Sequence, residues 1–252
     1  PMTSEQNGYW YADVPQAKVG DEYRYLLQTE KGEISRIDPY AREVTNSIGN
    51  SVVFDPGYDW GTTQYQLPPW NELVIYELHV GTFNDEKPNE DAPAKFDSVV
   101  RRFDHLKRLG VNCIQVMPIA EFAGDRSWGY NPANVFAVES AYGGPRAFKD
   151  FIKAAHDNGI GVILDVVYNH FGPSDLDLWQ FDGWSENDKG GIYFYNDWRS
   201  ETPWGDTRPD YGRGEVRQFI RDNAVMWLDE YRVDGLRMDM TLYIRSVRAD
   251  GE

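Results

Sequence analysis

The stretch Gly161-Val162-Ile163-Leu164-Asp165-Val166-Val167 decides the fold class of this protein. It is apolar except for Asp165, and short apolar runs of this kind are typical of strands that are buried on both faces of a parallel sheet. Three further runs have the composition of strands, at residues 73–80, 113–117 and 233–239. The sequence therefore predicts four strands of one parallel sheet.

The segments between the predicted strands have the periodicity of helices. Apolar residues recur there at the three- and four-residue spacing of a helix face. The three predicted faces are Phe96, Val99, Val100, Phe103 and Leu106; Phe148, Phe151, Ile152 and Ala155; and Val216, Phe219, Ile220 and Trp227. Alternating strands and helices indicate an α/β fold, either a (β/α)8 barrel or a doubly wound sheet. The sequence has no glycine-rich phosphate-binding fingerprint, which disfavours a nucleotide-binding sheet.

Residues 1–66 differ in character from the rest of the chain. They contain short strand-like runs separated by turns such as Lys31-Gly32, and few of them fit a helical period. We therefore expect part of a β-sandwich at 1–66, a linker at 67–72 and the α/β domain at 73–252. Within the α/β domain, residues 171–213 form a long connection after the third strand, and connections of such length usually carry function.

Composition narrows the classes of partner. The 252 residues carry a formal net charge of −16, whereas a nucleic-acid-binding protein needs a basic surface. No apolar run reaches the roughly 18 residues needed to cross a membrane. The single cysteine, Cys113, excludes an internal disulfide and favours a cytoplasmic location. Composition leaves the oligomeric state open.

Polar side chains stand at the ends of the third and fourth predicted strands. Arg237 and Asp239 are two residues apart and so share one face of their strand. Asp165 lies near the end of the preceding strand, and His170 follows it in the loop. An Arg/Asp pair alone is more often a structural ion pair, but four such residues at two neighbouring strand ends favour an active site. A retaining glycosidase needs two carboxyl groups about 5–5.5 Å apart, one that attacks the anomeric carbon and one that protonates the leaving oxygen.

These motifs resemble glycoside hydrolase family 13, the α-amylase superfamily. Asp165-Val166-Val167-Tyr168-Asn169-His170 is similar to the first conserved region of that family, and Gly235-Leu236-Arg237-Met238-Asp239 to the second. Trp128-Gly129-Tyr130 resembles the segment whose tyrosine stacks under a bound glucose. The resemblance covers residues 73–245 and implies a (β/α)8 TIM barrel, of which this chain would supply the first four strands. Residues 1–66 resemble the end of a starch-binding type of sandwich.

The resemblance also implies roles for individual residues. Asp239 would be the catalytic nucleophile and Arg237 its partner. The sugar-binding residues would be Trp128, Tyr130, Asp165 and His170. The substrate would be an α-glucan oligosaccharide or polysaccharide of the starch or glycogen type. Asn169 matches asparagines that serve a calcium site in some amylases, although no cluster of hard oxygen ligands is visible around it, and no other cofactor is expected.

One departure from the family concerns the general acid. In the family this acid is a glutamate at the end of the next strand, but only residues 240–252 follow Asp239 here. Since a crossover between parallel strands takes a dozen or more residues, we expect the acid to lie beyond residue 252 and the chain to be inactive alone. Glu77 and Glu121 are the first candidates for a substitute acid.

The subtype is open among several enzymes. Residues 76–83 and 169–173 are similar to maltooligosyl-trehalose trehalohydrolases and to some bacterial branching enzymes, whereas Met240-Thr241 replaces the Ala-Val that usually follows the nucleophile. We favour a 1,4-α-glucan branching enzyme over a trehalohydrolase, with a debranching hydrolase third. A non-catalytic glucan-binding module is the alternative from another class, because a sandwich with exposed tryptophans could bind glucan without turnover.

Overall fold

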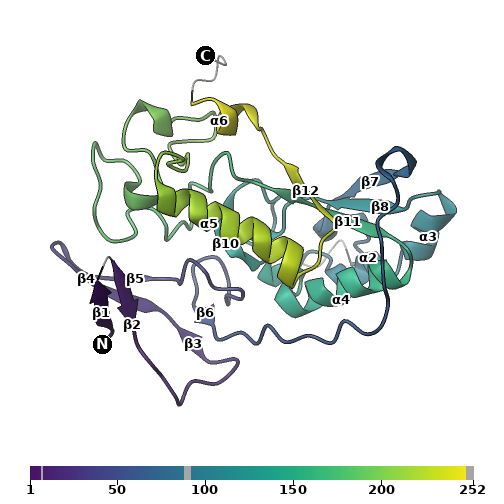
Figure 1. Ribbon diagram of the computed structural model, residues 1–252, viewed down its shortest axis with the longest axis horizontal. Coiled ribbons are helices and arrows are strands. Elements are labelled where there is room, and N and C mark those ends of the chain that lie inside the picture. Colours follow the sequence, from purple (N-terminus) through teal and green to yellow (C-terminus); the bar gives the residue numbers. More distant parts are fainter. Residues whose placement is uncertain (7, 88–91, 248–252) are drawn as a thin grey trace.

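A four-stranded parallel sheet forms the centre of the α/β domain. The computed structural model describes residues 1–6, 8–87 and 92–247, coloured along the chain in Figure 1. The sheet consists of β7 (Ile75–Leu78), β8 (Cys113–Val116), β11 (Gly161–Val166) and β12 (Gly235–Met238), in the spatial order β12-β11-β8-β7. Every pairing is parallel, so the four predicted strands are confirmed as one sheet that follows chain order.

The helix faces predicted after the second and third strands are mostly buried. They belong to α4 (Gly144–Asp157), to α5 (Gly214–Val225) and to a π-helical turn, η5 (Met226–Glu230), that continues α5. The buried side chains are Phe148, Phe151, Ile152, Ala155, Val216, Phe219 and Trp227, while Ile220 is partly buried against the same core. Helical periodicity therefore identified the surfaces that pack against the sheet.

The helix predicted over residues 96–106 is interrupted. It consists of α2 (Phe96–Val100) and α3 (Phe103–Arg108), separated by a turn. Arg102 leaves the helical conformation, with φ −106° and ψ 2°, and its Nε donates a hydrogen bond to Asn84 Oδ1 at 2.7 Å. The predicted face survives the break because both pieces turn their apolar residues toward the core.

An antiparallel hairpin that the sequence pattern did not predict follows β8. Its strands are β9 (Ala120–Phe122) and β10 (Pro132–Val138), which pair with irregular register. Every residue of β10 is buried, so β10 lacks the polar–apolar alternation by which an antiparallel strand is recognised. The loop between the two strands carries Trp128 and Tyr130, two of the predicted sugar-binding residues.

The long connection between β11 and α5 contains only short 3-10 turns, η3 (Gly191–Tyr193) and η4 (Trp198–Ser200), and isolated bridges. The other short helical segments are η1 (Trp70–Glu72), α1 (Val80–Phe83), η2 (Ser140–Tyr142) and α6 (Leu242–Arg245). Because His79 is the N-cap of α1, β7 ends before the predicted limit at residue 80. In the part of the chain that the structure describes, no helix has the length and apolar character needed to cross a membrane.

The described part of residues 1–66 (1–6 and 8–66) forms three separate two-stranded antiparallel sheets. They pair β1 (Thr3–Gln6) with β2 (Tyr9–Tyr11), β3 (Glu22–Tyr23) with β6 (Ser51–Val52), and β4 (Tyr25–Thr29) with β5 (Gly32–Arg36). Ile37, Ala41 and Val44 are buried in a small cluster with Ala137 of β10. These three apolar side chains of the segment therefore pack against the α/β domain, and the sandwich stays a prediction.

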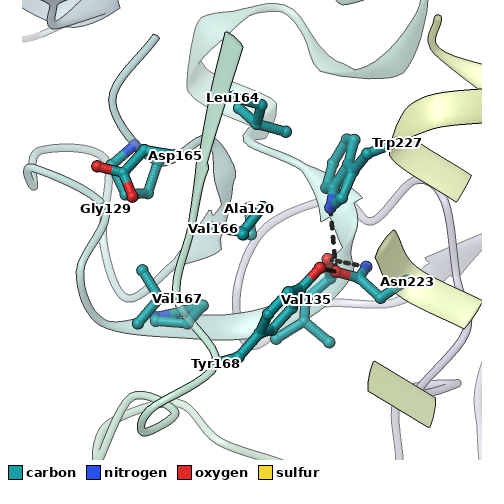
Figure 2. A pocket seen from close by; sticks show the side chains of 12 residues that line it. Ala120, Gly129, Val135, Leu164, Asp165, Val166, Val167, Tyr168, Asn223 and Trp227 are labelled. Atoms are coloured by element: carbon teal, nitrogen blue, oxygen red, sulfur yellow. Dashed lines mark hydrogen bonds between the residues drawn. The ribbon is translucent and has the colours of Figure 1, made fainter. Parts of the chain in front are cut away.

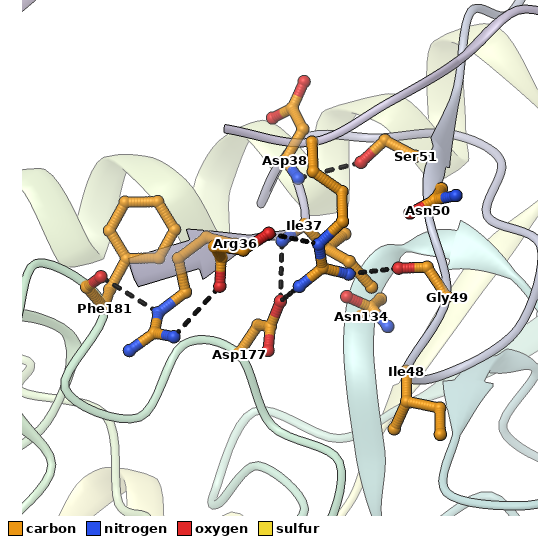
Figure 3. A network of polar contacts seen from close by, with 12 residues as sticks. Arg36, Ile37, Asp38, Ile48, Gly49, Asn50, Ser51, Asn134, Asp177 and Phe181 are labelled. Carbon is orange, nitrogen blue, oxygen red and sulfur yellow. Dashed lines mark hydrogen bonds and ion pairs between the residues drawn. The ribbon is translucent and has the colours of Figure 1, made fainter. Parts of the chain in front are cut away.

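The N-terminal segment contacts the long connection through Asp177 (Figure 3). One carboxylate oxygen of Asp177 accepts hydrogen bonds from the Ile37 N–H and from the Arg24 guanidinium, both at 2.6 Å. Arg36 donates to the backbone oxygens of Gln180 and Phe181 at 2.9 and 3.0 Å. Charged side chains of the N-terminal segment thus hold the first part of the long connection in place.

Candidate active site

Arg237 links two carboxylates at the carboxyl ends of β11 and β12. Its Nη1 donates to Asp165 Oδ2 and to Asp239 Oδ1, in both cases at 2.8 Å. The strand register places Asp165 opposite Arg237, and Asp239 lies two residues further along the chain. The structure thus brings together the three side chains that the strand spacing predicted to meet.

Burial and neighbouring charges act in opposite directions on the pKa values of Asp165 and Arg237. The Asp165 side chain is 0% exposed, compared with 11% for Asp239 and 41% for Arg237. Burial raises the pKa of Asp165, although hydrogen bonds from Tyr130 Oη, at 2.8 Å, and from Arg237 lower it. Burial also disfavours the charge on Arg237, but Asp165 and Asp239 outweigh this effect and raise the Arg237 pKa. Arg237 is therefore a cation throughout the ordinary pH range.

Asn169 holds the second oxygen of Asp239. Its Nδ2 donates to Asp239 Oδ2 at 2.9 Å and to the Asp239 backbone oxygen at 3.2 Å. Its Oδ1 lies 2.5 Å from Nδ1 of His170. Both ends of this amide, which the sequence had suggested for a calcium site, are therefore engaged with neighbouring side chains. Among the described residues, no three His, Cys, Asp or Glu side chains are grouped so that they could hold a metal ion.

His170 is buried, with partners for both ring nitrogens. Nδ1 faces Asn169 Oδ1, and Nε2 lies 2.9 Å from the backbone oxygen of Tyr130. Burial lowers the pKa of His170. The resemblance to glycoside hydrolase family 13 implied that His170 binds the sugar. In this structure such a contact requires Nε2 to exchange its bond to Tyr130 for one to the sugar.

The loop between β9 and β10 sets the position of Tyr130. Gly129 has a φ of +86°, and a Cβ at this position would overlap the carbonyl oxygen of Pro118. Only glycine therefore fits between Trp128 and Tyr130. Tyr130 points to Asp165 through its hydroxyl, whereas Trp128 is 71% exposed. Of the two predicted aromatic residues, the structure brings Tyr130 into the carboxylate cluster and leaves Trp128 at the surface.

A small cavity of about 20 Å³ lies beside Asp165 (Figure 2). Tyr168 Oη and Trp227 Nε1 line it and donate to Asn223 Oδ1 at 2.7 and 3.0 Å. A cavity of this size holds about one water molecule. The cavity is therefore too small to hold a sugar ring.

Comparison with known proteins identifies the family. The family model for the α-amylase catalytic domain matches residues 79–209. This chain belongs to the α-amylase family. It is 37% identical to a malto-oligosyltrehalose trehalohydrolase of Saccharolobus solfataricus over 94% of its length, and 37% identical to a 1,4-alpha-glucan branching enzyme of Picrophilus torridus over 100% of its length. The solved structure of a pullulanase from Bacillus acidopullulyticus matches 96% of the chain with a TM-score of 0.80 at 26% identity.

The chain covers only part of each of these α-amylase-family proteins. It spans 39% of the trehalohydrolase, 36% of the branching enzyme and 34% of the pullulanase chain. Family membership implies a (β/α)8 barrel, and the parallel order of β7, β8, β11 and β12 agrees with that architecture.

A ring-stacking contact of this α-amylase-family site was not predicted from the sequence. Trp204, in the long connection, stacks on His170 with ring centroids 4.7 Å apart and ring planes 15° from parallel. No periodicity or spacing relates a tryptophan in a loop to a histidine after a strand. The length of residues 171–213, which predicted a functional connection, was the one signal that pointed to this region.

The two glutamates considered as substitute acids have partners elsewhere. Glu121 is buried and accepts a hydrogen bond from the Ser140 N–H at 2.7 Å. Glu77 lies on β7, at the opposite edge of the sheet from β12, and accepts from Gln115 Nε2 at 2.7 Å. Among the described residues, neither is a hydrogen-bond partner of Arg237 or Asp239.

Proposed function

We propose that this chain is part of a retaining α-glucan glycosidase or transglycosidase in which Asp239 attacks the anomeric carbon. The observation that carries the proposal is the anchoring of both oxygens of Asp239. Arg237 binds Oδ1 at 2.8 Å, and Asn169 binds Oδ2 at 2.9 Å. Anchoring fixes the direction from which the carboxylate approaches a bound sugar, and the guanidinium stabilises its negative charge. These are the requirements of a carboxylate nucleophile.

Catalysis would proceed in two displacements at the same carbon. First, an Asp239 oxygen forms a bond to the anomeric carbon while the glucosidic bond breaks and the leaving oxygen takes a proton from a general acid. A glycosyl ester on Asp239 results. A water molecule, or a hydroxyl of a second glucan, then attacks that carbon, loses its proton to the conjugate base of the acid and releases Asp239. Water gives hydrolysis, and a glucan hydroxyl gives transfer.

The neighbouring side chains would hold the sugar that is being transferred. We assign Asp165 to accept hydrogen bonds from sugar hydroxyls, because Tyr130 and Arg237 fix its carboxylate. The ring of Tyr130 would support the sugar by stacking, and the exposed Trp128 beside it would extend this apolar surface. His170 would donate from Nε2 once its bond to the Tyr130 backbone is exchanged.

The general acid would be a carboxyl group that this chain does not contain. Glu121 and Glu77 are engaged with Ser140 and Gln115, and the chain covers 36–39% of the two enzymes described above. We therefore assign the acid to the remainder of a larger enzyme. In that enzyme, β7, β8, β11 and β12 would be the first four strands of the barrel, and residues 1–66 part of a sandwich preceding it.

For the complete enzyme we favour 1,4-α-glucan branching activity in the cytoplasm, and trehalohydrolase activity is the second candidate. The relatives named for these two activities are each 37% identical to this chain, so both activities have to be tested. Product analysis distinguishes them. A branching enzyme given a linear α-1,4-glucan forms α-1,6 branch points without a rise in reducing ends. A trehalohydrolase given a maltooligosyl-trehalose releases trehalose. A debranching hydrolase gives new reducing ends from a branched glucan, and binding without any of these products indicates a non-catalytic module.

A further inference from the structure

Trp204 covers one face of His170. The two rings are nearly parallel, with centroids 4.7 Å apart, and His170 is 2% exposed while Trp204 is 39% exposed. Trp204 reaches this position from the long connection, far along the chain from β11. A stacked indole restricts the rotation of the imidazole about its Cβ–Cγ bond, because a tilt of the ring would lose the stacking contact or collide with it.

Trp204 also contacts a side chain of α6. The Tyr243 ring packs edge-on against it, with centroids 5.5 Å apart and ring planes at 73°. The buried Arg208 guanidinium lies over Tyr243, 5.4 Å from the ring centroid, and donates to the backbone oxygens of Glu201 and Val247 at 2.8 and 2.5 Å. Arg208 therefore connects the turn that carries Trp204 to the residues that follow α6, and this connection restrains Trp204.

The His170 ring is connected to Asp239 through Asn169. His170 Nδ1 contacts Asn169 Oδ1, and the same amide donates to Asp239 Oδ2 at 2.9 Å. A rotated imidazole would lose the contact to Asn169, and the asparagine amide would then be held only by its own bonds to the Asp239 side chain and backbone oxygen. His170 Nε2 contacts the Tyr130 backbone from the same ring plane. Both partners are oxygen acceptors, so a neutral imidazole donates to one of them and an imidazolium to both; in either state the plane of the ring sets the direction of these contacts.

We propose that Trp204 is a positioning residue of the glucan site, acting on Asp239 and Tyr130 through the plane of the His170 ring. The inference rests on the proposed function, since it assigns a role within the same site. It concerns the flat surface of the indole, and a direct contact between Trp204 and the sugar is the competing explanation. The role of the planar indole surface can be tested by substitution, because leucine fills space without a planar face, whereas phenylalanine keeps a planar ring.

The test compares Trp204→Leu and Trp204→Phe in the complete enzyme. We expect Trp204→Leu to lower kcat by about tenfold with a smaller change in KM, and Trp204→Phe to stay within about threefold of the parent, since a stacked aromatic pair contributes this order of interaction. Trp198→Leu, at a 53% exposed tryptophan of the same connection, is the matched control and should leave kcat unchanged. If the Leu and Phe variants have equal thermal midpoints, a difference in kcat between them reflects positioning and not stability.

A double-mutant cycle with His170→Gln decides whether Trp204 acts through His170. We expect Trp204→Leu to cause less than about a twofold further loss in the His170→Gln background, because the ring to be positioned is gone. A full additional tenfold loss there, or equal losses for the Leu and Phe variants, would overturn the proposal in favour of sugar contact or general packing. Asp239→Asn separates the two levels of inference: if that variant stays active, the proposed function fails, whereas an inactive Asp239→Asn with a fully active Trp204→Leu refutes only the role of Trp204.

Discussion

Asp165 and Arg237 are register partners on adjacent parallel strands, and a single nitrogen of Arg237 lies 2.8 Å from Asp165 and 2.8 Å from Asp239. The sheet itself therefore assembles the charge cluster. The cation shared between the two carboxylates reduces the repulsion between their like charges. Asp239 and Asp165 thus share one counter-ion.

Replacement of the proposed nucleophile should remove turnover and keep binding. We expect Asp239→Asn in the complete enzyme to lower kcat by at least about a thousandfold, because the amide cannot form the glycosyl ester. Glucan affinity should change by less than about threefold, since the amide keeps the shape of the carboxylate. Rates on an α-glucan and binding by calorimetry measure the two quantities. Asp104→Asn, at a side chain that is 90% exposed, is the control, and a tenth of parent activity in Asp239→Asn would assign the nucleophile elsewhere.

The turn before Tyr130 should tolerate no side chain. Gly129→Ala places a Cβ against the Pro118 carbonyl at a φ of +86°, so we expect the loop to shift and kcat/KM to fall by about tenfold or more. Gly124→Ala is the matched control, because Gly124 also has a positive φ, +72°, but no atom within 4 Å of the added Cβ. If both variants lose activity equally, backbone conformation and not the overlap with Pro118 is responsible.

Folding stability should fall as pH rises from about 5 to 8, because of a buried pair of glutamates. Burial raises the pKa of Glu121 to about 7, and burial together with the charge of Glu121 raises the pKa of Glu139 to about 8. Both values exceed the ordinary 4.5, so the folded state holds protons that the unfolded chain releases in this range. Stability is then highest below this window and decreases by up to about 1.4 kcal/mol per pH unit for each proton.

Glu139→Gln tests this pH dependence. The amide does not titrate, so the variant should gain thermal stability relative to the parent at pH 8 and lose that advantage at pH 5. Melting temperatures at four pH values between 5 and 8 measure the effect in the complete enzyme. Glu5→Gln, at an exposed position of β1, should leave the profile unchanged. A parent profile that is flat over this range would show that the pair is not protonated in the folded state.

The sheet could be predicted from the sequence because its signals are local. β11 is one apolar run, and Arg237 and Asp239 share a strand face through their spacing alone. Contacts between distant loops have no such signature. The Asn169–Asp239 hydrogen bond and the stacking of Trp204 on His170 depend on how two connections fold over the strand ends. β10 was missed for another reason, since it is buried at every residue and so shows no alternation, while Pro132 and Asn134 interrupt the kind of apolar run by which β11 was recognised.

Asp177 should anchor the N-terminal segment to the long connection. Asp177→Ala removes the acceptor of the Ile37 N–H and the partner of Arg24, so we expect a loss of about 1–3 kcal/mol in the free energy of unfolding. Amide exchange of residues 24–38 should become faster, because these residues lose their attachment. Asp177→Asn keeps an acceptor oxygen without the charge and should lose less. Unchanged exchange in Asp177→Ala would show that Arg36 and the Ile37 cluster suffice.

The chain of residues 1–252, produced alone, should be inactive on glucans and should associate. β7 and β12 are the two edges of the sheet, and Ile75 and Tyr76 of β7 are 41% and 36% exposed. Exposed apolar edges of parallel strands pair with other chains, because their backbone N–H and C=O groups lack partners. We expect sedimentation of species larger than the monomer, and no branching or hydrolysis, since Asp239 would act without a proton donor. Adding charge to the edge by Ile75→Lys should reduce association without restoring activity. A monodisperse monomer that turns over glucan would contradict both expectations and would require a general acid within this chain.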